Sequence, residues 1–163
     1  GGSGKTTFAL LLSKELGSGV VQQDDFASWE NPLDWWPEVI EKIFRPIADG
    51  AKTISYPRTK WWPGHTPEPV ADTPVTNVMI LEGVSSLRKE FRDYVSIGIF
   101  VDTPDDICLR RGIERDMASG EPREKIEALW QKWLSSENEY FSRDNPKHYA
   151  DIIVDGNANF KRK

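Results

Sequence analysis

The first seven residues of the chain form most of a phosphate-binding loop. They read Gly-Gly-Ser-Gly-Lys-Thr-Thr, so the closing positions of the motif G-x-x-x-x-G-K-[ST] fall on Gly4, Lys5 and Thr6. In such a loop the backbone N–H groups, together with the N-terminus of the following helix, bind phosphate oxygens. Apolar residues at helical spacing do follow, which a plain flexible turn would not require. The residues expected to bind a nucleotide are Gly1, Gly2, Ser3, Gly4, Lys5, Thr6 and Thr7.

The composition excludes several classes of protein. With 163 residues, 38% of them hydrophobic and 29% charged, the chain is long enough for one globular domain with a proper core. Its net charge of −5 argues against a nucleic-acid partner. The single cysteine, Cys108, excludes an internal disulfide and fits the reducing cytoplasm. No apolar run approaches the roughly 18 residues that would suggest a membrane span.

Short apolar runs alternate with amphipathic segments along the chain, which predicts an α/β fold. We expect a parallel sheet flanked by helices in three layers, because the runs have the continuous apolar character of strands covered on both faces. The expected strands are 19–23, 77–82, 95–102 and 150–154. The expected helices are 6–16, 34–48, 87–93, 105–116 and 123–141.

One segment fits neither element. Residues 57–74 contain five prolines, which exclude a regular helix and a central strand. We expect this segment to be an excursion over the edge of the sheet, near the substrate.

Acidic side chains come at the ends of the first three expected strands. Asp24 and Asp25 follow the first, Glu82 ends the second and Asp102 ends the third. Each alone is compatible with a solvated loop carboxylate. In an open parallel sheet, however, the carboxyl ends of the strands face one crevice, where the phosphate-binding loop also lies. Phosphoryl transfer needs a held metal and a positioned nucleophile, and carboxylates at this place could supply both.

Two arginines share a face of the expected helix 105–116. Arg111 and Arg115 are four residues apart, and stacked like charges destabilise a helix by about 0.2–0.5 kcal/mol unless an anion meets them. A phosphate is one such anion; the alternative is neutralisation by the nearby acids Asp105, Asp106, Glu114 and Asp116. Residues 116–123 interrupt the helical pattern and end in Arg123, so we expect them to form a lid over ATP.

Taken together, six segments resemble the uridine kinase family of P-loop nucleoside kinases. They occur in the family's order over nearly the whole chain, and two tryptophan-rich segments (33–37 and 130–133) resemble a bacterial branch of it. The six are Gly-Gly-Ser-Gly-Lys-Thr-Thr (1–7), Gln-Asp-Asp-Phe (23–26), Ile-Leu-Glu-Gly (80–83), Phe-Val-Asp-Thr-Pro (100–104), Arg-Asp (115–116) and Tyr-Ala-Asp-Ile-Ile-Val (149–154).

The resemblance implies ATP and Mg²⁺ as cofactors and assigns roles to the site residues. Thr6 and Glu82 match the metal site, with Asp24 beside it as the carboxylate that activates the nucleoside 5′-hydroxyl. Lys5 and Arg115 match residues that contact the transferred phosphoryl group, and Arg111 and Arg123 are expected on the nucleotide. The substrate positions are Glu30 for the ribose, with Asp34 close enough to compete, and Tyr56 and Arg58 for the base.

The chain also departs from the family pattern. Gly112 stands where many uridine kinases have a second arginine, and Gly120 and Pro122 stand where the usual lid carries two. The family's tyrosine-to-histidine segment that contacts the base is not recognisable. These departures concern the acceptor, whereas the residues expected to serve phosphoryl transfer are present.

We therefore expect a cytoplasmic, ATP-dependent kinase for the 5′-hydroxyl of a pyrimidine nucleoside, with homo-oligomerisation left open. Other acceptors remain open: nicotinamide riboside, pantothenate, a sugar or a nucleoside monophosphate. A rival from another class is an ATP-binding module without turnover, which the presence of both Asp24 and Glu82 disfavours.

The position of the loop motif gives a last expectation. Its first glycine would lie two positions before Gly1, so we expect this chain to lack the central strand that precedes the loop in P-loop kinases. The neighbours of that strand should then be separated by a gap or abnormally close. We expect residues 1–163 alone not to fold stably, since total stabilities are only about 5–15 kcal/mol.

Overall fold

Two pairs of parallel strands form the sheet layer of the computed structural model, which describes residues 1–28, 31–58, 68–69 and 72–158 (only the backbone of 68–69 and of Ser119). Strand β1 (Gly19–Gln22) pairs with β6 (Met79–Glu82), and the ladder ends at the pair Gln22 and Glu82. Strand β7 (Ile99–Asp102) pairs with β8 (Ile152–Asp155). Within the described ranges β6 and β7 are not hydrogen-bonded to each other, so the two pairs form separate two-stranded sheets.

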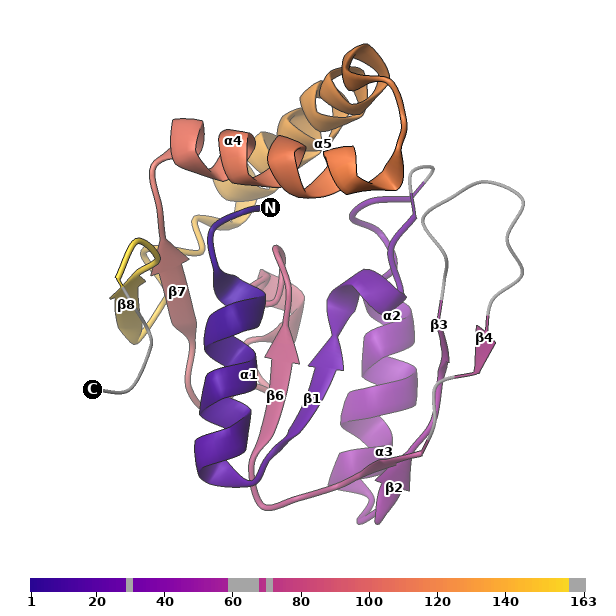
Figure 1. Ribbon diagram of the computed structural model, residues 1–163. Helices are drawn as coiled ribbons and strands as arrows, with labels where there is room; N and C mark the ends of the chain where they lie inside the picture. Colours follow the sequence, from indigo (N-terminus) through magenta and orange to yellow (C-terminus); the bar gives the residue numbers. More distant parts are fainter. Residues whose placement is uncertain (29–30, 59–67, 70–71, 159–163) are drawn as a thin grey trace.

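Helices cover both faces of the β1–β6 pair, which confirms the expected layered α/β fold (Figure 1). Helix α1 (Lys5–Leu16) contacts both strands on one face. On the other face lies one long helix, whose segments are α2 (Trp36–Val39), a π-helical stretch (Ile40–Phe44) and α3 (Arg45–Ala48). Its apolar side packs on the strands in the main core, together with Trp35, Tyr56 and Phe91.

The π-helical stretch has a physical cause in the sequence. Pro46 lies two residues after it, and a proline has no N–H to donate to the carbonyl four residues earlier, which its ring would also crowd. A single π turn absorbs such a defect without ending the helix. The sequence pattern predicts the helix and its apolar face, but the structure begins it at Trp36 rather than at residue 34.

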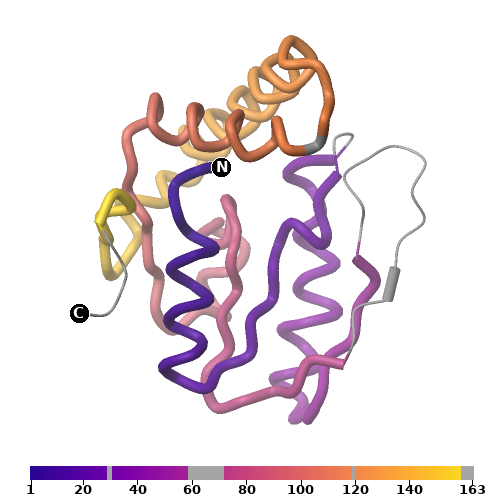
Figure 2. Tube along the Cα trace, in the orientation of Figure 1, coloured from indigo at the N-terminus to yellow at the C-terminus, as the bar shows by residue number. Residues whose placement is uncertain are grey.

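A helical hairpin of α4 (Asp105–Asp116) and α5 (Arg123–Asp144) lies across the carboxyl ends of the strands (Figures 1 and 2). It has its own small core, made by Ile113, Ile126, Trp130 and Trp133, with Leu109 and Val84 packed against it. The indole of Trp130 lies so close to Gly112 that any side chain there would overlap it. The tryptophans of α5 are therefore core residues, as the sequence predicts.

The proline-rich segment forms two short antiparallel pairs. Strand β2 (Thr53–Ile54) pairs with β5 (Thr73–Pro74), and β3 (Pro57–Arg58) pairs with β4 (Glu68–Pro69). In Figure 1, β2, β3 and β4 lie on the β1 side of the molecule, and residues 59–67 and 70–71 of the expected excursion lie outside the described residues. Trp61 and Trp62 lie outside the described residues.

Three expectations about elements were wrong. The helix expected over 87–93 is only a 3₁₀ turn, Lys89–Phe91, because the chain turns back at Tyr94 and Val95, whose N–H groups both bond to the carbonyl of Phe91. The strands expected to start at 77, 95 and 150 start at 79, 99 and 152 and are shorter than expected. Strand β8 is not covered on both faces: its Ile152 and Ile153 are about half exposed.

Candidate active site

The glycine-rich loop has the backbone that its sequence requires. Gly2 and Gly4 adopt φ values of 76° and 92°, which side chains other than glycine rarely tolerate, and Gly4 caps α1. A side chain at Gly2 would also overlap the carbonyl of Cys108 on α4. The Thr103 hydroxyl donates a hydrogen bond to the carbonyl of Ser3 at 2.9 Å. These contacts fix the loop against the end of β7 and the start of α4.

The first turn of α1 brings two of the predicted residues to Glu82. The Thr6 hydroxyl donates to Glu82 Oε1 at 3.0 Å, and the Lys5 ammonium lies close enough to attract that carboxylate. Glu82 is only 8% exposed. Burial raises the pKa of Glu82 above its ordinary value, more than Lys5 and Thr6 lower it. The site therefore holds a carboxylate whose charge is incompletely compensated by the protein.

Asp24 joins this group from the other strand. It lies in the 3₁₀ turn Gln23–Asp25 that follows β1, is exposed, and raises the pKa of Glu82 by charge repulsion. Loop, α1 and both strand ends thus bring Lys5, Thr6, Asp24 and Glu82 together, which are four residues that the sequence predicts.

These oxygen donors fit Mg²⁺. The ion prefers hard oxygen ligands and usually takes one or two carboxylates together with substrate phosphates and water. Thr6 Oγ1 and Glu82 Oε1 are 3.0 Å apart, so one cation could contact both oxygens. No group of three or more metal-binding side chains occurs in the part of the chain that the structure describes, so an all-protein cage is not what these residues form.

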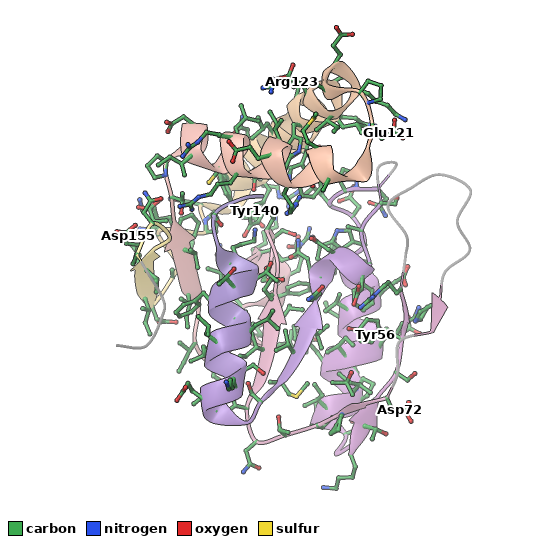
Figure 3. All side chains as sticks on the ribbon, viewed as in Figure 1. Tyr56, Asp72, Glu121, Arg123, Tyr140 and Asp155 are labelled. Carbon is green, nitrogen blue, oxygen red and sulfur yellow. The ribbon has the colours of Figure 1, made fainter. Side chains whose placement is uncertain are left out.

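Two of the predicted substrate residues contact a buried acid instead of facing an open site. Arg58 Nε lies 2.7 Å from Asp25 Oδ1, and the Tyr56 hydroxyl donates to Asp25 Oδ2 at 3.3 Å. Tyr56 is buried and its ring stacks on Phe26 at 4.8 Å; Figure 3 shows it between β3 and the long helix. Burial raises the pKa of Asp25, and burial also raises the pKa of Tyr56. Arg58 remains half exposed, so its outer face can still meet a ligand.

The three arginines expected on the nucleotide bind protein groups. Arg111 donates to the carbonyl of Gly156 and to Asn157 Oδ1, both beyond β8. Arg115 pairs with Asp116 at 2.7 Å and lies 6.0 Å from the Trp130 ring, which matches the alternative of neutralisation by a nearby acid. Arg123 pairs with Glu127 at the outer end of the hairpin (Figure 3).

The third strand-end acid does not join the other two. Asp102 Oδ2 accepts a hydrogen bond from Lys147 at 2.7 Å. Asp102 also lines an open hollow of about 650 Å³ with Thr103, Asp155 and their neighbours. Because Thr103 also bonds to Ser3, this hollow lies beside the glycine-rich loop.

The predicted ribose contacts are less well defined. Asp34 is exposed, and its N–H bonds to Asn31 at 2.8 Å. Glu30 lies outside the described residues.

Comparison with known proteins decides the family. A model described as the phosphoribulokinase/uridine kinase family matches residues 39–159, well over half of the chain. The chain belongs to this family. It is thus a uridine kinase-like P-loop kinase, and the family implies the use of ATP and a small-molecule substrate.

The uridine kinase of Lactobacillus johnsonii is 28% identical over 94% of this chain and 81% of its own length. The uridine kinase of Escherichia coli K12 is 43% identical over 47% of this chain and 37% of its own length. A solved structure, described as a possible uridine kinase from Bacillus stearothermophilus, superposes with a TM-score of 0.64 at 20% identity. It covers 94% of this chain and 83% of that one, which supports the fold.

Among the described residues of this family member, no helix combines the length and apolarity needed to cross a lipid bilayer. Its glycine at 112, where many uridine kinases have an arginine, now has a structural reason, since Trp130 fills that space.

Sequence reasoning missed two residues of the site. Gln23 and Thr103 tie the loops together through contacts between distant segments, and only their places inside the family motifs gave a signal.

Proposed function

We propose that the protein transfers the γ-phosphoryl group of ATP to the 5′-hydroxyl of a pyrimidine nucleoside. The observation that carries this proposal is the meeting of Lys5, Thr6, Asp24 and Glu82 where the glycine-rich loop approaches the carboxyl ends of β1 and β6. A cation, a metal site and an exposed carboxylate are the parts that phosphoryl transfer needs. The nucleoside is suggested by the relatives that are called uridine kinases.

Each residue has a role in this proposal. Lys5 and the loop amides stabilise negative charge on the transferred group, and Thr6 and Glu82 would hold Mg²⁺, which would supply positive charge beside the phosphate oxygens. Asp24, exposed beside them, orients the acceptor hydroxyl and takes its proton. In this proposal Arg58, which pairs with Asp25 and is half exposed, contacts the base of the acceptor with its outer face.

The hollow at the ends of β7 and β8 is the proposed place for the nucleoside half of ATP. It adjoins the loop through Thr103, and polar groups of Asp155 and Asn157 line it. Hydrogen-bond acceptors of this kind suit the exocyclic amino group and ribose hydroxyls of a purine nucleoside.

A panel of acceptors tests the proposal. ADP release would be measured with uridine, cytidine, nicotinamide riboside, pantothenate, a sugar and a nucleoside monophosphate at saturating ATP and Mg²⁺. We expect turnover with uridine or cytidine, and ADP release with sugars alone would overturn the nucleoside assignment.

The Asp24→Asn variant tests the mechanism. We expect it to lower kcat by about 10²–10⁴-fold, because it cannot accept the hydroxyl proton. Nucleotide affinity, measured by calorimetry, should change little. Full acceptor-dependent turnover in this variant would show that Asp24 is not the base.

A further inference from the structure

Gln23 stands at the junction between the sheet and the site. It is the first residue after β1 and opens the 3₁₀ turn that carries Asp24. Its side chain is completely buried, which is uncommon for a glutamine and calls for hydrogen-bond partners.

Those partners come from the other strand end. Gln23 Oε1 accepts hydrogen bonds from the backbone N–H of Ser85 at 3.0 Å and from the Ser86 hydroxyl at 3.2 Å, with the Ser85 hydroxyl at 3.5 Å. A backbone N–H can only donate, so the side-chain oxygen, not the amide nitrogen, must face Ser85. All these donors lie in the segment that follows Glu82.

The backbone between Glu82 and Ser85 is shaped around this side chain. Gly83 has a φ of 155°, a conformation that other residues rarely adopt. A side chain at Gly83 would overlap Cγ and Cδ of Gln23 and lie 2.6 Å from its Oε1. Glycine at this position is thus required by the path of the glutamine.

The backbone ladder between β1 and β6 ends at Gln22 and Glu82. Beyond it, the two loops carry Asp24 and the Glu82 carboxylate, which repel each other. The Gln23 side chain supplies hydrogen bonds across the gap at the point where the ladder stops. It counters the tendency of the two strand ends to separate.

We propose that Gln23 is a positioning residue that holds Asp24 and Glu82 at the separation needed for phosphoryl transfer. It touches neither substrate nor metal in this proposal; it acts through the two loops that it joins. The inference rests on the proposed function, because only a reaction that uses both carboxylates would make their separation matter. Misplacement of reacting groups by about 1 Å can cost about 10²-fold in rate.

The test compares variants of Gln23 that differ in one property. Gln23→Met has a similar length but no acceptor, whereas Gln23→Glu keeps the oxygen that faces Ser85. Val21→Ala is the matched control, since Val21 is buried two residues before Gln23, in β1, but packs in the main core. Each variant would be measured for kcat, for the KM of ATP and for thermal stability, with amide hydrogen exchange of residues 83–86.

We expect Gln23→Met to lower kcat by about 10–100-fold with less than about a threefold change in the KM of ATP. Exchange at the Ser85 amide should quicken, while exchange in α5 stays unchanged. Gln23→Glu should recover most of the kcat, with a pH profile displaced to higher pH because it adds a negative charge beside Asp24 and Glu82. Val21→Ala should lose thermal stability but keep its kcat.

A folded Gln23→Met variant with a kcat within threefold of wild type would overturn the proposal. So would an equal loss of kcat in Val21→Ala, which would show a merely structural role. If Gln23→Met does not melt cooperatively, Gln23→Asn, which is one methylene too short to reach Ser85, carries the same test. If the wild-type protein turns over no acceptor, the proposed function fails. In that case, unchanged hydrogen exchange at the Ser85 amide in Gln23→Met would by itself refute the inference that Gln23 joins the two loops.

Discussion

Replacing Glu82 with glutamine should make the protein more stable and nearly inactive. The carboxylate is 8% exposed, and its raised pKa means that burial costs more than Lys5 and Thr6 return. A glutamine has the same shape and its Oε1 can still accept the Thr6 hydrogen bond. The side chain would therefore keep its place while losing the uncompensated charge.

The expected magnitude is a difference between two opposing effects. A hydrogen bond to a charged group contributes about 1.5–3 kcal/mol and one to a neutral group about 0.5–1.5, so the change weakens the Thr6 bond by about 1 kcal/mol. The cost of burying a charge is several kcal/mol per ion. The direction of the Glu82 pKa shift fixes the sign of the sum, so we expect a net gain of at most a few kcal/mol, and each kcal/mol raises Tm by about 2–4 °C.

The gain should depend on pH in a defined direction. A carboxyl group with a raised pKa favours folding while it is protonated, and this contribution is lost as the pH rises through its folded-state pKa. Below the ordinary value of 4.5 the variant and the wild type should therefore melt alike. Above the folded-state pKa, the Glu82→Gln protein should melt at the higher temperature.

Thermal melts from pH 4 to 8 without nucleotide, with exposed Glu41→Gln as the control, measure this difference. Acceptor-dependent turnover of Glu82→Gln should fall by at least about 10²-fold, since a neutral amide binds the proposed Mg²⁺ less well than a carboxylate does. A variant less stable than wild type at pH 7 would refute the reasoning, because it would show that Lys5 and Thr6 compensate the buried charge fully.

Three other substitutions have defined outcomes. Gly112→Ala should lower the free energy of unfolding by about 1–3 kcal/mol, measured by chemical denaturation, because the new methyl group overlaps Trp130. Arg115→Ala should lower kcat much more than it weakens ATP binding if its guanidinium leaves Asp116 to meet the moving phosphoryl group; kinetics that change only the KM of ATP would contradict this. Tyr56→Phe should cost about 1 kcal/mol in thermal melts by removing the hydrogen bond to Asp25, and an unchanged Tm would show that this 3.3 Å contact contributes nothing.

Local patterns predicted the elements that depend on local rules. The glycine-rich loop predicted α1, and strong apolar runs predicted β1 and β6, together with the acids at their ends. The 3₁₀ turn at Lys89–Phe91 was mistaken for a helix, because a few apolar residues at helical spacing do not reveal that the chain turns back after one turn. A proline can end a helix or be accommodated by a single π turn, and the spacing of apolar residues does not predict which. The π turn before Pro46 was therefore not predicted.

Contacts between distant segments set the limit of prediction at the site. The partners of Arg111 come from residues after β8, which the sequence did not indicate, whereas the pairing of Arg115 with Asp116 is the alternative that the sequence offered. Asp25 was grouped with Asp24 by sequence, yet it turns inward to Tyr56 and Arg58 while Asp24 stays exposed. Adjacent side chains in a turn face different surroundings. Only the packing of the proline-rich strands against β1 decides which of the two aspartates turns inward.

The separation of the two hydrophobic cores has a consequence for how related kinases can diverge. The core of the α4–α5 hairpin shares no buried residue with the core around β1 and β6 among the described residues. Val84, two residues after Glu82, packs against the hairpin core. Substitutions at Val84 should therefore change the contact between the hairpin and the segment after Glu82 while the proposed substrate residues stay unchanged. We expect such substitutions to alter turnover without altering specificity.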